Sequence, residues 1–271
     1  LAITVVQNKK RGIKAIVWEC LIVLFMIKPA IDARRVARGN SIAEDALMEP
    51  SLELTFTKCI DMFGESIPSS VLQTYALLEA DEVAVSAVVS IFVSALSIAY
   101  ASSTISLDFD TDPLKRRIAP GFYGYVPDTN RLQVMVLMTL LTAAHVLMKV
   151  LACALILRLS STWFWFYIMS DVSLFFIYKI LRRDVRHWIP LNGIAGWIAS
   201  GIIRLVIKVI VDFTLIVQFR HPFELGGAYW SMNIVLNQVF CFVAILLYKR
   251  FLNEEITSNA EFEGYSIEFP F

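Results

Sequence analysis

Apolar and polar positions alternate along the chain in long blocks, and the apolar blocks predict helices that cross a membrane. An apolar run of about 18 or more residues can span the hydrocarbon core as a helix, because every backbone group then finds a partner within the segment. Val83 to Ser106 is such a run and contains no charged residue. The predicted spans lie near 83–106, 132–157, 163–181, 194–218 and 228–248, and 249–271 is expected to be a C-terminal tail.

The first third of the chain has no uninterrupted apolar run of that length, so its elements are predicted from shorter patterns. Segment 42–78 has the pattern of an amphipathic helix that continues into an apolar half-helix broken at Pro68, and together they are expected to cross once. Segment 15–27 is short for a crossing and has basic residues on both sides, which favours a re-entrant element. Residues 1–6 are expected to end an earlier span, in a chain that begins within a larger protein.

These elements predict one all-α membrane domain over residues 1–271, a polytopic transmembrane helical bundle with a re-entrant segment and a Pro-broken helix. Composition agrees, since 57% of the residues are hydrophobic, 18% are charged and the mean hydropathy is +0.64. A formal net charge of zero and the lack of any nucleic-acid-binding signature argue against nucleic acid as a partner. The four cysteines stand singly, without metal-ligand spacing, so neither a metal site nor a disulfide framework is predicted.

The distribution of lysine and arginine predicts orientation, because cytoplasmic loops of membrane proteins are enriched in both. The basic clusters comprise Lys9, Lys10, Arg11 and Lys14; Lys28, Arg34, Arg35 and Arg38; Lys115, Arg116, Arg117 and Arg131; Arg182, Arg183 and Arg186; and Lys249 and Arg250. All of these basic loops are expected on the cytoplasmic side. We expect an integral, multi-pass protein of the plasma membrane rather than of an organelle.

A polar stripe is predicted in the stretch GESIPSSVLQTY, which begins at Gly64. Asp61, Glu65, Ser69 and Gln73 are spaced by four, which places them on one ridge of an α-helix. Pro68 has no N–H to donate to the carbonyl of Gly64, so a free backbone acceptor is expected beside Glu65. The alternative is a helix that starts at the interface, with Glu65 solvated and Pro68 in the first turn.

Ionisable residues also interrupt the later spans at helical spacing. Ser200, Arg204, Lys208 and Asp212 form the longest such row. Such groups cost at least about 2.5 kcal/mol each at membrane depth, so they normally face a protein interior or water and pair with one another. The residues assigned to one polar cleft, which would serve as a lipid path, are Asp61, Glu65, Gln73, His145, Lys149, Asp171, Arg204, Lys208 and Asp212.

Within this cleft we expect charge balance, with basic groups opposite acidic ones. Lys149, Arg204 and Lys208 would face Glu65, Asp171 and Asp212. The alternative is a salt-bridge network that only fixes helix packing. His145 has no carboxylate on its own helix and is more simply explained as a satisfied polar group than as a general base. No catalytic motif, cofactor fingerprint or metal-ligand set occurs, so the protein is not expected to be an enzyme or to bind a cofactor.

The stretch ESIPSSVLQTY resembles an element of the XK-related family of polytopic membrane proteins, with the pattern Glu-x-x-Pro-x-x-x-Leu-Gln-x-Tyr. The Ser-rich segment 89–103 is similar to the next span of that family, and the resemblance covers residues 15–106. The matching positions are Glu65, Pro68, Leu72, Gln73 and Tyr75. Pro-Ser-Ser stands where the family usually has Pro-Gln-Leu. Several members are phospholipid scramblases, so the resemblance implies a helical membrane fold, with a re-entrant segment before this element, and passive lipid movement.

Three functions follow from these predictions. The first is passive movement of phospholipids between leaflets along the charged cleft, with membrane lipids as partners. The second is a passive solute or ion pathway lined by the same residues. The third is a non-transporting interaction subunit, in which the serines of 83–106 dock a single-span helix or a second copy of the chain.

Overall fold

The computed structural model describes residues 12–24, 31, 34, 50–80, 82–111, 129–181, 194–214 and 227–262. Helices account for the secondary structure in these ranges, and no strand occurs in them. The all-α helical class predicted from the sequence is therefore confirmed. The chain divides into two compact units, Leu1–Met62 and Phe63–Phe271. The sequence predicts one membrane domain over the same residues.

The first unit contains α2 (Ile13–Leu24) and α4 (Pro50–Asp61). The 12 residues of α2 extend for only about 18 Å, which is too short to cross the hydrocarbon core. Its length agrees with the predicted re-entrant element at 15–27, which stays a prediction because 25–27 lie outside the described residues. The predicted end of an earlier span at 1–6 lies outside them as well. Glu19 and Ile22 are the buried residues of α2.

A π-helical turn, η2 (Met62–Ser66), lies between α4 and α5 (Ile67–Glu79). Pro68 sits in the first turn of α5 and cannot donate to the carbonyl of Gly64, so the backbone preceding it takes the wider five-residue spacing. The predicted break near Pro68 is therefore a π turn. The four-residue spacing resumes in α5 after this turn.

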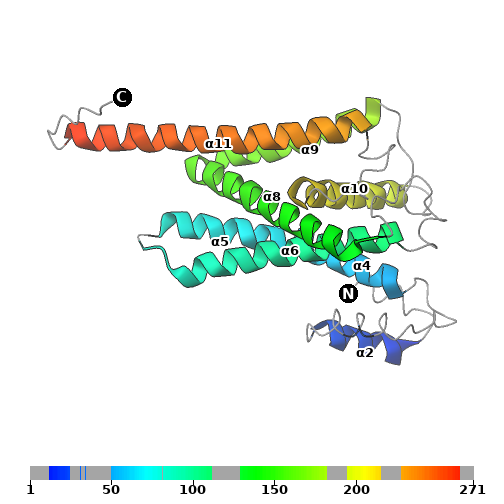
Figure 1. The fold of residues 1–271 in the computed structure, drawn as a ribbon. Coiled ribbons are helices and arrows are strands. Elements are labelled where there is room, and N and C mark those ends of the chain that lie inside the picture. The colour runs from blue at the N-terminus through cyan, green and yellow to red at the C-terminus, as the bar shows by residue number, and fades with distance from the viewer. Residues whose placement is uncertain are drawn as a thin grey trace. The chain divides into compact units, whose positions relative to one another are not determined.

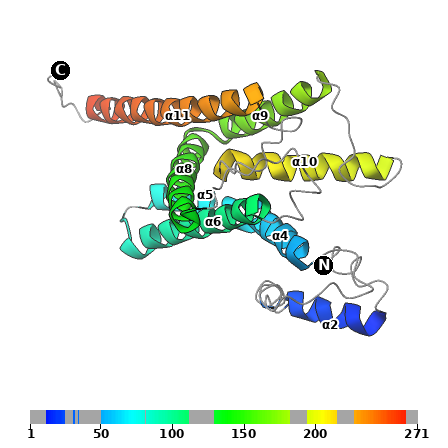
Figure 2. The ribbon, with the colours of Figure 1, turned by 45° about the vertical axis from the view of Figure 1, so that its right-hand side comes forward.

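The second unit continues with five long helices (Figure 1): α6 (Val85–Thr111), α8 (Arg131–Leu159), α9 (Ser161–Leu181), α10 (Ile194–Thr214) and α11 (Gly227–Phe262). The central helix is α8, since it packs against α5, α6, α9, α10 and α11. Of its apolar window 61% is buried, against 28% or less for the three other apolar spans. Both views show α5 and α6 side by side (Figures 1 and 2).

Four helical segments among the described residues are long and apolar enough to cross a membrane, so this is an integral membrane protein. They are Val85–Asp108, Arg131–Leu159, Ser161–Leu181 and Val235–Leu252. Each overlaps a predicted span. The predicted tail 249–271 differs from the structure, because α11 continues to Phe262. Polar residues after Arg250 end the apolar span. No Gly or Pro occurs between Arg250 and Phe262 to end the helix earlier.

The direction of the helices follows from which residues meet. Only Ser160 separates α8 from α9, and Lys149 of α8 contacts Tyr167 of α9, so the chain turns back at Ser160. Lys149 contacts Asn237, and farther along both helices Ala152 and Ile156 share a core with Cys241 and Ala244. Residue numbers thus rise together on α8 and α11, which run parallel. Small side chains at this contact allow the close approach that stabilises helix pairs in membranes.

The parallel course of α8 and α11 determines the side of the bundle from which the chain enters α10. We call the end of the bundle where α8 begins the Arg131 side and the other end the Ser160 side. Since α9 returns to the Arg131 side and α11 starts from it, the chain between Leu181 and Gly227 must enter and leave on that side. Asp212, two residues before the end of α10, contacts His145, which lies halfway along α8. Figure 2 shows one end of α10 against α8 and the other projecting away from it.

This arrangement bears on two sequence predictions. The predicted crossing at 194–218 stays a prediction, because 215–218 lie outside the described residues. Arg204, Lys208 and Asp212 of this helix are all buried, as ionisable groups inside a membrane bundle normally are. Lys249 and Arg250 do not share a side with Arg131, because Arg250 lines a pocket together with Ser160.

Candidate functional site

Polar side chains from four helices of the second unit meet near the middle of the bundle. We call them the polar cluster. Its members are His145 and Lys149 on α8, Tyr167 and Asp171 on α9, Lys208 and Asp212 on α10, and Asn237 and Gln238 on α11. Arg204 and Ser200 lie one and two turns earlier on α10 and are also buried. The row predicted on α10 is thus buried along its length.

Lys208 joins two carboxylates in the first half of the cluster. Its side chain is 1% exposed, and Nζ lies 2.6 Å from Oδ2 of Asp171 and also donates to Asp212 one turn along α10. The carboxylate of Asp171 is 30% exposed, whereas that of Asp212 is 7% exposed. Charge-assisted hydrogen bonds of this kind offset the desolvation of a buried ammonium. This part of the predicted balance, with Lys208 opposite Asp171 and Asp212, is present in the structure.

Lys149 lies in the second half of the cluster and has a different environment. It is 1% exposed and donates to the hydroxyl of Tyr167 and to Oδ1 of Asn237. Its Nζ also lies 4.5 Å from the ring centroid of Phe240, 4.9 Å from that of Tyr167 and 6.0 Å from that of Phe213. Within the described part of the chain, no carboxylate contacts Lys149. Neutral oxygens and aromatic faces therefore surround this buried cation.

His145 connects α8 to the end of α10 and to α11. Its Nε2 lies 2.9 Å from the backbone carbonyl oxygen of Asp212, which can only accept, so Nε2 carries the hydrogen. Its Nδ1 lies 3.1 Å from Nε2 of Gln238, and we assign that amide as the donor to Nδ1. The imidazole is therefore neutral and satisfied at both nitrogens. It also satisfies one of the carbonyls that a helix end leaves without an intrahelical partner.

The structure does not bring the other predicted cleft residues to this cluster. Glu65 and Gln73 of the second unit are exposed, and so is Asp61 of the first unit. Gln73 donates to Ser69 at 3.1 Å and accepts from Ser90 of α6 at 3.5 Å. The expected pairing of Glu65 with buried basic residues is therefore not found. Glu65 and Gln73 lie on the exposed face of this helical segment, so neither side chain reaches the buried cluster.

The three motif residues of α5 have separate environments. Leu72 is 59% exposed, on a surface that faces outward from the second unit. Pro68 is exposed in the first turn, which matches the alternative prediction of a proline at a helix start. Tyr75 donates to Oε1 of Glu79 at 2.8 Å along the same helix. These contacts are local to α5, so the motif supports the helix rather than the buried cluster.

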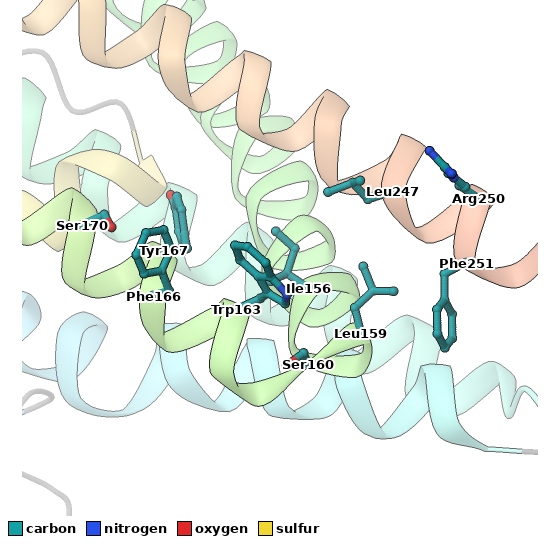
Figure 3. A pocket seen from close by; sticks show the side chains of 10 residues that line it. All are labelled: Ile156, Leu159, Ser160, Trp163, Phe166, Tyr167, Ser170, Leu247, Arg250 and Phe251. Atoms are coloured by element: carbon teal, nitrogen blue, oxygen red, sulfur yellow. The ribbon is translucent and has the colours of Figure 1, made fainter.

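A pocket of about 730 Å³ opens on the outer surface of α8, α9 and α11, toward the Ser160 side (Figure 3). The residues that line it are Ile156, Leu159, Ser160, Trp163, Phe166, Tyr167, Ser170, Leu247, Arg250 and Phe251. Its lining is mostly apolar and aromatic, and α9 and α11 expose large hydrophobic side chains beside it. Exposed apolar side chains on a membrane helix are suited to contact with acyl chains, so we expect lipid to reach the pocket.

Tyr167 belongs to both the pocket and the polar cluster. Its ring lines the pocket and stacks on Phe240 at a centroid distance of 3.7 Å, with 9° between the ring planes. Its hydroxyl accepts from Lys149 on the other side. One aromatic side chain thus contacts both the pocket and a buried ammonium.

Sequence reasoning missed Asn237 and Gln238, which complete the cluster from α11. The signal was present, since two adjacent amides stand in the middle of the apolar run VLNQVF. An amide inside a membrane span needs a partner on a neighbouring helix. The prediction considered charged residues and therefore did not include these amides.

Comparison with known proteins identifies no relative, since no family model, curated protein or solved structure matches the chain.

Proposed function

We propose that this integral membrane protein moves phospholipids passively between the two leaflets. The observation that carries the proposal is the position of Tyr167, which lines a lipid-accessible pocket and also contacts the buried polar cluster. A headgroup that crosses a bilayer must exchange water for other polar partners at mid-depth. The cluster offers such partners beside a surface where acyl chains can remain in lipid.

The proposed movement is driven by the lipid gradient alone. Nucleotide-binding and catalytic motifs are lacking in the sequence, and we propose that the protein acts by lowering a barrier and not as an enzyme. Direct charge pairing at Lys208 keeps the cluster satisfied while no headgroup is present. We place the Arg131 side in the cytoplasm, because most of the basic residues in the second unit belong to connections on that side.

We further propose that the chain is a divergent relative of the XK-related family. Support comes from the element Glu65–Tyr75 and the Ser-rich segment 89–103, which α5 and α6 place next to each other. Gln73 of the first and Ser90 of the second meet at 3.5 Å. Plasma-membrane location is part of the same proposal.

A passive ion or solute pathway is the second candidate, and α10 favours it. The backbone carbonyl of Asp212 on α10 lies beside the middle of α8, and backbone carbonyls at mid-depth are what coordinate ions in the discontinuous helices of transporters. Here His145 occupies the carbonyl of Asp212. This candidate predicts ion flux without any exchange of lipid between leaflets.

Liposome reconstitution separates these functions. The purified chain is incorporated into vesicles that contain a trace of fluorescent phosphatidylcholine, and a membrane-impermeant reductant is added. Lipid movement predicts bleaching beyond the outer-leaflet share, whereas protein-free vesicles stop at that share. Met169→Leu, on the exposed face of α9, serves as a matched control and should bleach like the parent.

Folded parent protein that leaves the inner-leaflet label intact would exclude lipid movement. Flux of a trapped ion-sensitive dye in those vesicles would then support the second candidate. If neither lipid movement nor ion flux is detected, the remaining candidate is the interaction subunit, in which the exposed serines of α6 dock another helix.

A further inference from the structure

Lys149 is unusual among the charged residues of the second unit that contribute to the polar cluster. Lys208 contacts two carboxylates, but Lys149 contacts a phenol, an amide oxygen and three aromatic rings. Neutral partners compensate less for the burial of an ammonium than an anion does. Lys149 is thus a buried cation with capacity for an anionic ligand.

The path by which such a ligand would arrive is the pocket of about 730 Å³. Tyr167 lines the pocket and its hydroxyl accepts from Lys149, while Trp163, Phe166 and Phe251 supply apolar surface. Arg250 is among the lining residues (Figure 3). The pocket therefore has an apolar lining, a cation within that lining and a second cation in contact with one of its lining residues.

We propose that Lys149 binds the phosphate of a phospholipid that enters this pocket, and that Tyr167 is the side chain that must move aside to admit it. This inference rests on the proposed function and adds the site and the class of headgroup. A phosphate oxygen replaces the Tyr167 hydroxyl as acceptor from Lys149, so a charge-assisted hydrogen bond takes the place of a neutral one. The acyl chains stay against the aromatic lining.

A phospholipid fits this geometry better than a free anion does. The residues between the outer surface and Lys149 are predominantly apolar, so a hydrated inorganic phosphate would lose water without gaining contacts. An acyl chain gains those contacts. Zwitterionic and anionic phospholipids share the phosphodiester and should both bind, whereas diacylglycerol has the same chains but no phosphate.

Lipid retention in detergent tests the site directly. Native mass spectrometry compares phosphatidylcholine and diacylglycerol bound to the parent, to Lys149→Met and to Lys179→Met. Lys179 is a matched control, because it is a buried lysine on α9 outside the pocket. We expect Lys149→Met to lower phosphatidylcholine retention about tenfold, which corresponds to about 1.4 kcal/mol, and to leave diacylglycerol unchanged. Lys179→Met should retain both lipids like the parent.

Tyr167→Phe provides a second variant that keeps the ring and its stacking on Phe240. Without the hydroxyl, Lys149 has one acceptor fewer, so the phosphate no longer has to displace the hydrogen bond between Lys149 and Tyr167 when it binds. We expect phosphatidylcholine retention to rise about three- to tenfold, in line with the loss of one hydrogen bond. Thermal unfolding of each variant identifies any protein that has failed to fold, and Tyr167→Phe still tests the site if Lys149→Met does not fold.

Equal phosphatidylcholine retention by folded Lys149→Met and the parent would overturn the proposal. Competition by millimolar inorganic phosphate would overturn it as well, because the site would then select a free anion. Retention that depends on Lys149 in a protein that moves no label in vesicles would support the site and refute the proposed function. Bleaching that is insensitive to Lys149→Met would instead support the function and refute the site.

Discussion

Replacement of Lys208 by methionine tests whether the buried charges hold the helices together. Methionine keeps most of the length of the side chain and removes the ammonium, so two carboxylates lose their common partner. Removal of one partner from a buried ion pair costs about 3–5 kcal/mol, whereas an exposed pair contributes about 0–1 kcal/mol. The contact of Lys208 with Asp212 is of the first kind, with side chains 1% and 7% exposed. Asp171, at 30% exposed, lies between the two cases.

We therefore expect Lys208→Met to destabilise the protein by about 3 kcal/mol, mostly through Asp212. The triple variant Lys208→Met, Asp171→Asn and Asp212→Asn removes the stranded charges as well, and should recover stability to within about 1 kcal/mol of the parent. Thermal unfolding in detergent, with all variants under one condition, measures the difference. If Lys208→Met unfolds at the temperature of the parent, or if the triple variant is no more stable than the single one, the charges do not act as a buried network.

Three other predictions concern the helices around this cluster. Cysteines introduced at Arg131 and at Lys249 should react with an impermeant thiol reagent from opposite faces of the membrane, and labelling from one face would contradict the parallel course of α8 and α11. Ala244→Leu should destabilise the α8–α11 contact by about 1–3 kcal/mol, since Ala244 is 0% exposed, whereas Leu246→Ala on the exposed face should have little effect on the unfolding temperature. Gly201→Ala should stabilise α10 by about 0.5–1 kcal/mol, because the added methyl group meets no atom within 4 Å, and a lower unfolding temperature would refute this.

Hydropathy predicted the apolar helices well because their lengths are set by the thickness of the hydrocarbon core. The predicted span 132–157 agrees with Arg131–Leu159, and 163–181 agrees with Ser161–Leu181. Length and apolar composition predicted a helix at α10, but they do not show how it lies in the bundle. The direction of α10 follows from the parallel packing of α8 and α11. That packing involves small residues such as Ala152 and Ala244, and no local sequence pattern predicts which two helices will pair.

The candidate site was predicted in part for a related reason. Four-residue spacing placed Arg204, Lys208 and Asp212 on one buried face of α10, because an uninterrupted α-helix preserves such a ridge. The same spacing does not indicate whether a ridge faces the interior, and the ridge that holds Glu65 and Gln73 is exposed. Partners across helices were harder to identify, since the contact of Lys149 with Asn237 spans 88 positions in the sequence.

The buried charges of α10 have a consequence for membrane insertion. Arg204, Lys208 and Asp212 are costly against lipid, so this helix is stabilised when their side chains find polar partners. The partners of Lys208 and of the Asp212 carbonyl lie on α9 and α8. Both helices precede α10 in the chain, so these partners are already present when α10 is synthesised.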